Sequence, residues 1–165
     1  MFQKFALVTL TMCLAIFIAP ITSLAGDDES KQTIDLSPEL VSLLRAEMTE
    51  LSDGIQRTAL FIATADWKAI EDTSKTMHES YIMKKSLTQQ QSMELKKKLP
   101  DEFKKLDAAF HERAKQLGQA AASKDTELVS FRYARLVESC ADCHNAFAKN
   151  RFPGFLHLPS EHHEH

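Results

Sequence analysis

Apolar residues recur at three- and four-residue intervals along most of the chain, and no other feature limits the possible folds as much. This spacing is typical of helices with one apolar face, whereas half-buried strands alternate apolar and polar residues. No such alternation is evident, and glycine occurs only four times among 165 residues. The pattern therefore predicts an all-α protein.

Two helices are predicted in the first half of the chain. The first covers about residues 38–64, because Ser37 suits an N-cap and Pro38 the first helical position. Gly54 is expected to interrupt this helix softly. Asp66 is suited to cap a second helix. The residues expected to face inward are Leu40, Leu44, Met48, Leu51, Ile55 and Ile62 in the first helix and Trp67, Ile70, Met77 and Tyr81 in the second.

Two further helices are predicted after a polar, lysine-rich connection at residues 84–98, which has room for a helical piece of its own. One begins at Pro100, and the other covers about residues 126–149 and is stopped by Pro153-Gly154. Their expected inward residues are Phe103, Leu106, Phe110, Leu117 and Ala121, then Val129, Tyr133, Leu136, Cys140 and Phe147. Four amphipathic helices with short links predict an antiparallel four-helix bundle.

The N-terminal residues have the features of a secretory signal peptide. Lys4 gives a positive start, an apolar run follows from Phe5 to Ala19, and Ser23-Leu24-Ala25 resembles a cleavage site. A membrane anchor is the alternative, but the apolar run falls short of the roughly 20 residues that a spanning helix needs. We therefore expect cleavage after Ala25, export to the periplasm and no stable membrane insertion afterwards.

Cleavage would leave a polar lead at residues 26–36, a helical domain at 37–152 and a His-rich tail at 153–165. The predicted signal peptide holds one charged residue, Lys4. After its removal, 19 of the 20 basic residues and all 23 acidic residues remain, which gives a net charge of −4. This mild acidity argues against nucleic acid and anionic membranes as partners. The tail is interpreted as a frayed polar end or as a weak site for transition metals.

The cysteines give the sharpest chemical signal. After loss of Cys13 with the leader, only Cys140 and Cys143 remain, and His144 follows at once. This C-x-x-C-H sequence is the attachment signature of c-type haem. Residues three and four apart share a helical face, so both thiols can form thioethers with one porphyrin while the imidazole reaches its iron. The motif predicts one covalent haem.

Two other chemistries also use closely spaced cysteines. A thioredoxin-like redox pair belongs beside a βαβ pattern, which this chain lacks. A zinc site needs about four ligands and would have to recruit His78 or His111 from another helix. His78 would also be the candidate for a second histidine on iron. We prefer haem, because the export signal and the helical context agree with it.

The sequence from Leu136 to Phe147 resembles the end of the last helix in class II cytochromes c, the family that includes cytochrome c′. The similarity covers roughly residues 38–150 and is strongest in this last helix. It implies a four-helix bundle with Cys140 and Cys143 as haem attachments and His144 as the proximal ligand. It also implies either an exported electron carrier or a gas-binding haem protein, and often a dimer formed through the first two helices.

Two departures from the family concern other haem contacts. Ala148, with Lys149 beside it, stands where the family often has a basic residue. The family's first helix carries an arginine four residues before the distal residue; Arg45 matches this arginine, but Met48 follows it at three and Thr49 at four. Met48 is interpreted either as a core methionine or as the sixth iron ligand. Arg45, Arg132 and Arg135 are candidates to pair with haem propionates, although Arg132 also suits a solvated helix surface.

These residues favour one function and leave a second open. With Met48 on the iron, the protein would be a one-electron carrier between periplasmic redox proteins. With an empty sixth position, it would be a five-coordinate protein that binds nitric oxide or another small gas. No Ser-His-Asp or paired-carboxylate arrangement is evident, so we do not expect an enzyme. A homodimer remains an expectation from the family resemblance.

Overall fold

A computed structural model describes residues 34–80 and 82–157, all within one compact unit of the chain. The predicted signal peptide, most of the polar lead, Tyr81 and the end of the His-rich tail lie outside these residues. The helices are α1 (Pro38–Ala63), α2 (Trp67–Glu79), α3 (Met83–Ser86), α4 (Gln89–Lys98), α5 (Asp101–Ser123) and α6 (Thr126–Phe147), followed by the 3-10 helix η1 (Pro153–His157). The described part of the chain contains no strand, which confirms the all-α prediction.

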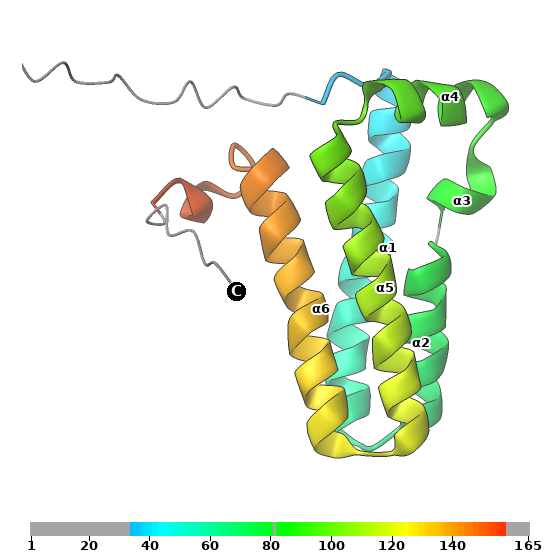
Figure 1. Ribbon diagram of the computed structural model, residues 1–165, viewed down its shortest axis with the longest axis vertical. Coiled ribbons are helices and arrows are strands. Elements are labelled where there is room, and N and C mark those ends of the chain that lie inside the picture. The colour runs from blue at the N-terminus through cyan, green and yellow to red at the C-terminus, as the bar shows by residue number, and fades with distance from the viewer. Residues whose placement is uncertain (1–33, 81, 158–165) are drawn as a thin grey trace, which may run out of the picture. The chain divides into compact units, whose positions relative to one another are not determined.

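The four long helices α1, α2, α5 and α6 form the predicted bundle, each antiparallel to the next (Figure 1). The most extensive contact joins α2 to α5, and the next joins α5 to α6. By contrast, α1 and α6 approach each other at few places. The core lies between the helices and consists of Ile70, Met77, Phe110, Ala114, Leu117, Ala120, Ala121, Val129 and Leu136. None of the helices described is both long and apolar enough to cross a membrane.

The first helix runs without a break through Gly54, so the expected soft interruption was wrong. Gly54 is buried, and its carbonyl accepts a 2.8 Å hydrogen bond from the Thr58 hydroxyl. One glycine costs a helix only about 1 kcal/mol. Burial of Leu51 and Ile55, which pack against the core from the same helix, outweighs this cost.

The polar connection does contain helices. Thr88 and Gln91 form a capping box at the start of α4, and α4 lies across the ends of α1 and α5 (Figure 1). The Glu94 carboxylate of α4 accepts a 2.8 Å hydrogen bond from the Ser37 backbone N–H, just before α1. Leu36, at the end of the polar lead, is buried. The connection therefore fixes the point at which α1 enters the bundle.

The last helix ends at Phe147, two residues before the predicted end, and Pro153 is not what stops it. The Ala148 N–H closes the final turn on the His144 carbonyl at 2.9 Å. The Ala148 carbonyl then accepts the N–H groups of Arg151 and Phe152 at 2.9 and 3.0 Å. This tight turn, rather than the proline, takes the chain out of the helix. Pro153 begins η1 instead.

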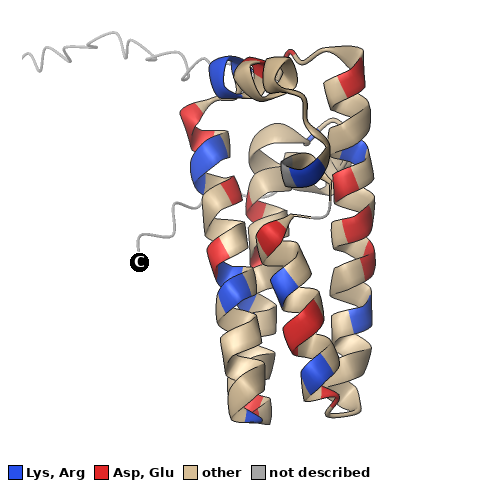
Figure 2. Cartoon of the chain, turned by 90° about the vertical axis from the view of Figure 1, so that its right-hand side faces the viewer, with Lys and Arg blue, Asp and Glu red and all other residues tan. Residues whose placement is uncertain are grey.

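Charged residues of both signs are interspersed along the helices on the side shown in Figure 2. Several pairs follow helical spacing, such as Lys98 with Glu94 at 3.1 Å. Exposed pairs of this kind contribute little to stability. This side of the molecule therefore carries a mixed charge pattern.

Candidate haem site

The three residues of the C-x-x-C-H motif lie in the last two turns of α6. Cys140 is three residues from Cys143 and four from His144, so all three side chains occupy one side of the helix. Both thiols are free, and each of the three residues is half-buried. The structure thus brings the predicted attachment residues together on a partly covered face.

Burial controls the protonation of the two thiols. It raises the pKa of Cys140, and it raises the pKa of Cys143 to about 11, with the nearby charge of Asp107 as the second cause. Both groups are therefore protonated thiols at neutral pH, with little of the reactive thiolate. A thioether to a haem vinyl group would need one sulfur and one hydrogen, and each protonated thiol holds both.

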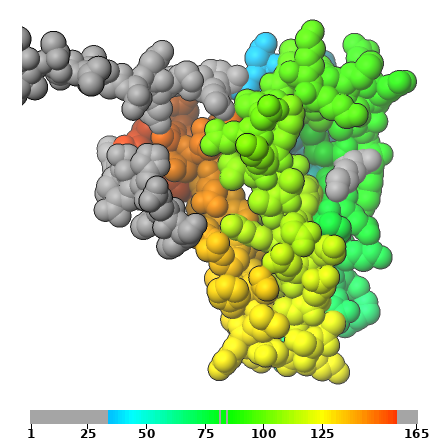
Figure 3. Space-filling view, in the orientation of Figure 1, coloured from blue at the N-terminus to red at the C-terminus, as the bar shows by residue number. Residues whose placement is uncertain are grey.

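The imidazole of His144 is held in its neutral form. Partial burial lowers its pKa, and the positive charge of Arg151 lowers it further. Neutral imidazole is the form that binds metals. The ring of Phe152 is stacked on it, with ring centroids 4.3 Å apart and planes at 23°. Phe152 belongs to the turn that leads into η1, which lies beside the end of α6 (Figure 3).

The surroundings of the motif include an aromatic pair. Phe147 of α6 meets Phe103 of α5 edge to face, with centroids 5.3 Å apart, and both rings are half-buried. Apolar and aromatic side chains suit the faces of a porphyrin, and two free thiols beside a neutral imidazole are the donors that c-type haem uses. The residues present therefore fit a haem at this end of the bundle.

One hydrogen bond defines how α1 and α6 are aligned. The Tyr133 hydroxyl of α6 donates to the Ile55 carbonyl of α1 at 3.1 Å. Seven residues are about two helical turns, or roughly 10.5 Å. Because the helices are antiparallel, Met48, seven before Ile55, lies level with Cys140, seven after Tyr133. Met48 also shares the side of α1 that carries Ile55.

Met48 is not a core residue, however. The expectation that it faces inward with the apolar residues of the first helix was wrong. Its exposed fraction is 41 %, whereas Leu40 and Ile70 are fully buried. The reason is its place at the edge of the apolar face, where α1 and α6 make few contacts. The Met48 thioether is therefore partly exposed rather than packed into the core.

The three arginines suggested for the propionates lie in different surroundings. Arg45 is exposed on α1, close in sequence to Met48. Arg132 is half-buried and donates to the Gln116 side chain of α5 at 2.9 Å. Arg135 pairs with the Glu138 carboxylate at 2.5 Å. Among the described residues, the Arg45 side chain has no hydrogen-bond or ion-pair partner, while Arg132 and Arg135 interact along the α5 side of α6.

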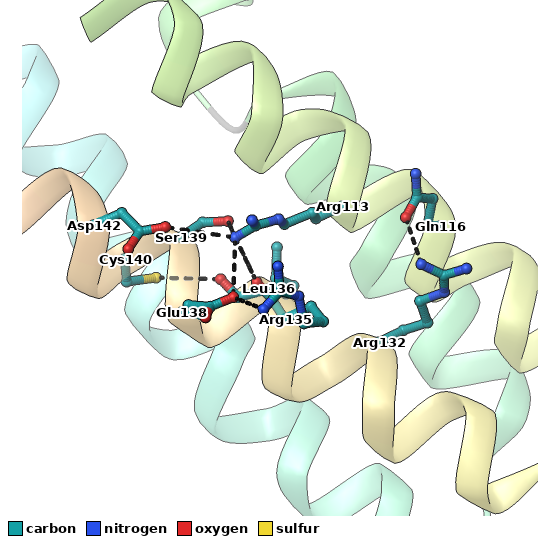
Figure 4. A network of polar contacts seen from close by, with 9 residues as sticks. All are labelled: Arg113, Gln116, Arg132, Arg135, Leu136, Glu138, Ser139, Cys140 and Asp142. Carbon is teal, nitrogen blue, oxygen red and sulfur yellow. Dashed lines mark hydrogen bonds and ion pairs between the residues drawn. The ribbon is translucent and has the colours of Figure 1, made fainter. Parts of the chain in front are cut away.

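A fourth arginine, which sequence reasoning missed, contacts the motif turn directly (Figure 4). The Arg113 guanidinium of α5 donates to the Arg135 carbonyl at 2.9 Å and to the Ser139 hydroxyl at 2.7 Å. It also lies 3.6 and 3.7 Å from the carboxylates of Glu138 and Asp142. Ser139 precedes the first motif cysteine, and Asp142 lies between the two cysteines. Arg113 therefore ties this turn to α5 and offsets negative charge beside the thiols.

His78 and His111 bond to each other's helices. The His78 Nδ1 is 3.0 Å from the His111 carbonyl, and the His111 Nδ1 is 2.9 Å from the Met77 carbonyl. Both side chains are half-buried. Across residues 34–157, Tyr81 aside, no group of three or more His, Cys, Asp or Glu side chains is arranged to hold a metal ion. The ligands that the zinc alternative needs are thus not brought together in this part of the chain.

Comparison with known protein families decides the assignment. The family model described as cytochrome C′ matches residues 37–148. The chain belongs to the cytochrome c′ family. A search of curated proteins and a search of solved structures found no significant match.

Membership of the cytochrome c′ family gives the motif its chemistry. The matched residues include the four long helices and all of Cys140, Cys143 and His144. The family implies a covalently bound c-type haem, and its members are typically periplasmic haem carriers or binders rather than enzymes. Phe152 lies beyond the match, which ends at Ala148.

Proposed function

We propose that this cytochrome c′ family member is a periplasmic monohaem cytochrome that carries single electrons. Cys140 and Cys143 would hold the haem through two thioethers, and His144 and Met48 would ligate its iron. The bound iron supplies the chemistry, by taking up and releasing one electron. The protein supplies the attachment, the two ligands and a partly apolar surround.

The alignment of α1 with α6 is the observation that carries the proposal. The hydrogen bond from Tyr133 to Ile55 sets Met48 level with Cys140. Helical side chains lean toward the N-terminal end of their own helix. In an antiparallel pair, Met48 therefore leans toward the level of His144, and His144 leans toward the level of Met48. These leaning directions support a site in which both side chains would reach one haem.

A rigid site suits electron transfer, because little has to reorganise when the iron changes charge. Arg113 fixes the turn that carries the cysteines, through its bonds to Ser139 and the Arg135 carbonyl. Phe103 and Phe147 pack the adjoining end of α5 against α6. Arg45 is proposed to pair with a haem propionate from the exposed side of α1.

A five-coordinate haem that binds nitric oxide or another small gas is the second candidate. Family membership slightly favours it. The 41 % exposure of Met48 also means that its thioether is not fixed by core packing. In this candidate the side of α1 that carries Met48 would only border the open iron position.

Absorption spectra of the wild type and of two methionine variants distinguish the two candidates. Oxidised wild-type protein is expected to be low-spin and to show the long-wavelength charge-transfer band of methionine on iron. Met48→Ala should lose this band and become high-spin, while Met93→Ala, which changes an exposed methionine of α4, should keep it. A high-spin wild type whose spectrum is unchanged in Met48→Ala would reject methionine ligation and favour gas binding.

Covalent attachment has its own test. Colour should stay with the protein through extraction with acidified acetone, and Cys140→Ala together with Cys143→Ala should release it. Extraction of the colour from the wild type, or zinc in place of haem, would contradict the proposal. The mature protein is expected to begin at Gly26, which mass spectrometry can check.

The partners proposed are periplasmic redox proteins, with a homodimer as a further possibility from the family resemblance. Light scattering of the purified holoprotein measures the oligomeric state. A monomeric mass at high protein concentration would reject the dimer.

A further inference from the structure

The chain turns back on α6 immediately after the motif. The Ala148 N–H donates to the His144 carbonyl, and the Ala148 carbonyl accepts from both Arg151 and Phe152. Phe155 N–H then donates to the Phe152 carbonyl at 3.1 Å. Backbone hydrogen bonds on both sides therefore fix the position of Phe152 relative to the last turn of α6.

This turn brings an aromatic ring against the proximal histidine. The centroids of His144 and Phe152 are 4.3 Å apart and the planes differ by 23°, which is a stacked contact between two half-buried rings. Stacking has two consequences. It restricts rotation of the imidazole about its bond to Cβ, and it covers one imidazole face from water.

We propose that Phe152 is a positioning residue that sets the orientation of the His144 imidazole on the haem iron. The inference rests on the proposed function of His144 as iron ligand. Groups that orient a metal-binding histidine tune the metal, and an apolar cover around it lowers the local polarity. Since the family match ends at Ala148, this control is a feature of the C-terminal segment of this chain.

The holoprotein provides the test. Proton NMR of the oxidised protein reports the imidazole orientation through the spread of the four haem methyl resonances. Phe152→Leu removes the stacked ring and should change this spread and lower the reduction potential, because water then reaches the ligand. Phe152→Tyr keeps the ring and should restore the wild-type pattern.

Two other variants make the test specific. Phe131→Leu removes an exposed ring of α6 four residues before Arg135 and should leave the methyl resonances unchanged. Pro153→Ala, at an exposed position, loosens the turn without removing the ring and should give a smaller change in the same direction. If Phe152→Leu yields little haem-loaded protein, Pro153→Ala still tests whether the turn affects the imidazole orientation.

The outcomes distinguish this inference from the proposed function. A wild type that carries no haem overturns both, since His144 then has no iron to bind. A haem-loaded wild type whose methyl resonances and potential are the same in Phe152→Leu and Pro153→Ala overturns the positioning role alone. Equal changes in Phe131→Leu would also overturn it, because the effect would not depend on the stack.

Discussion

The pairing of α2 with α5 and the pairing of α1 with α6 differ in how closely the helices pack. Between α2 and α5, a Cβ added to Gly118 would lie only 3.3 Å from the Ser74 Cβ, and Met77 and Leu117 are fully buried. Between α1 and α6 the contacts are few, and Met48 remains exposed. One pair is a close-packed scaffold, and the other leaves side chains available beside the haem motif.

The difference teaches that the stability of the bundle and the proposed iron ligation belong to different helix pairs. Small residues let α2 and α5 approach and bury a continuous core. The looser α1–α6 pair keeps a methionine and an imidazole accessible at one end. Substitutions in the two pairs should therefore change different properties.

The largest expected effect is on the close-packed pair. Leu117→Ala removes a fully buried side chain and should lower the free energy of unfolding by about 2–5 kcal/mol. Met48→Ala, at an exposed position, should cost less than about 1 kcal/mol while changing the haem spectrum. Denaturant unfolding followed by circular dichroism measures both variants. Equal costs would remove the distinction between the two pairs.

Overpacking tests the same pair from the other direction. Gly118→Val should lower the free energy of unfolding by about 1–3 kcal/mol, because its methyl groups meet Ser74 and the Glu71 carbonyl at the α2–α5 contact. Gly154→Val provides the control, since an added Cβ there meets nothing within 4 Å. Thermal unfolding compares the two. If Gly118→Val left the free energy of unfolding unchanged, α2 and α5 would be less closely packed than described.

Arg113 joins the scaffold to the motif, and its loss should affect both properties. Arg113→Met keeps an apolar stem but removes the bonds to Ser139 and Arg135, at a cost of about 1–2 kcal/mol in the free energy of unfolding. The Asp142 carboxylate, which then lacks its Arg113 partner, should also favour ferric iron and lower the reduction potential, whereas Glu138 keeps its pairing with Arg135. Electrochemistry of the haem protein measures this shift. A matched change at the exposed Arg57→Met should shift neither quantity.

The smallest expected effect concerns the hydrogen bond across the open pair. Tyr133→Phe removes the donor to the Ile55 carbonyl and should lower the free energy of unfolding by about 1 kcal/mol. Since Met48 is aligned through this contact, the methionine band should also broaden or weaken. A loss of stability as large as that of Leu117→Ala would show that the α1–α6 pair carries far more of the stability than its few contacts indicate.

The sequence by itself determined the local structure and the chemistry of the motif. Pro38 at the start of α1, Asp66 at the start of α2 and the helical spacing of apolar residues predicted the helices to within two residues at most ends. Capping and helical hydrogen bonds join residues three or four apart, so they can be read from the sequence. The same short spacing places both motif cysteines and His144 on one face. The two errors in local structure, at Gly54 and Pro153, came from treating single residues as helix breaks, although contacts of neighbouring residues determine where the helices end.

Only the tertiary structure decided which residues from other segments meet the motif. The exposure of Met48 depends on how far α1 stands from α6. The contacts of Arg113 depend on the alignment of α5 with α6, and the stack of Phe152 on His144 depends on a turn closed by backbone hydrogen bonds. These alignments follow from the packing of whole helix faces, to which many side chains contribute at once. No local pattern in the sequence carries that information.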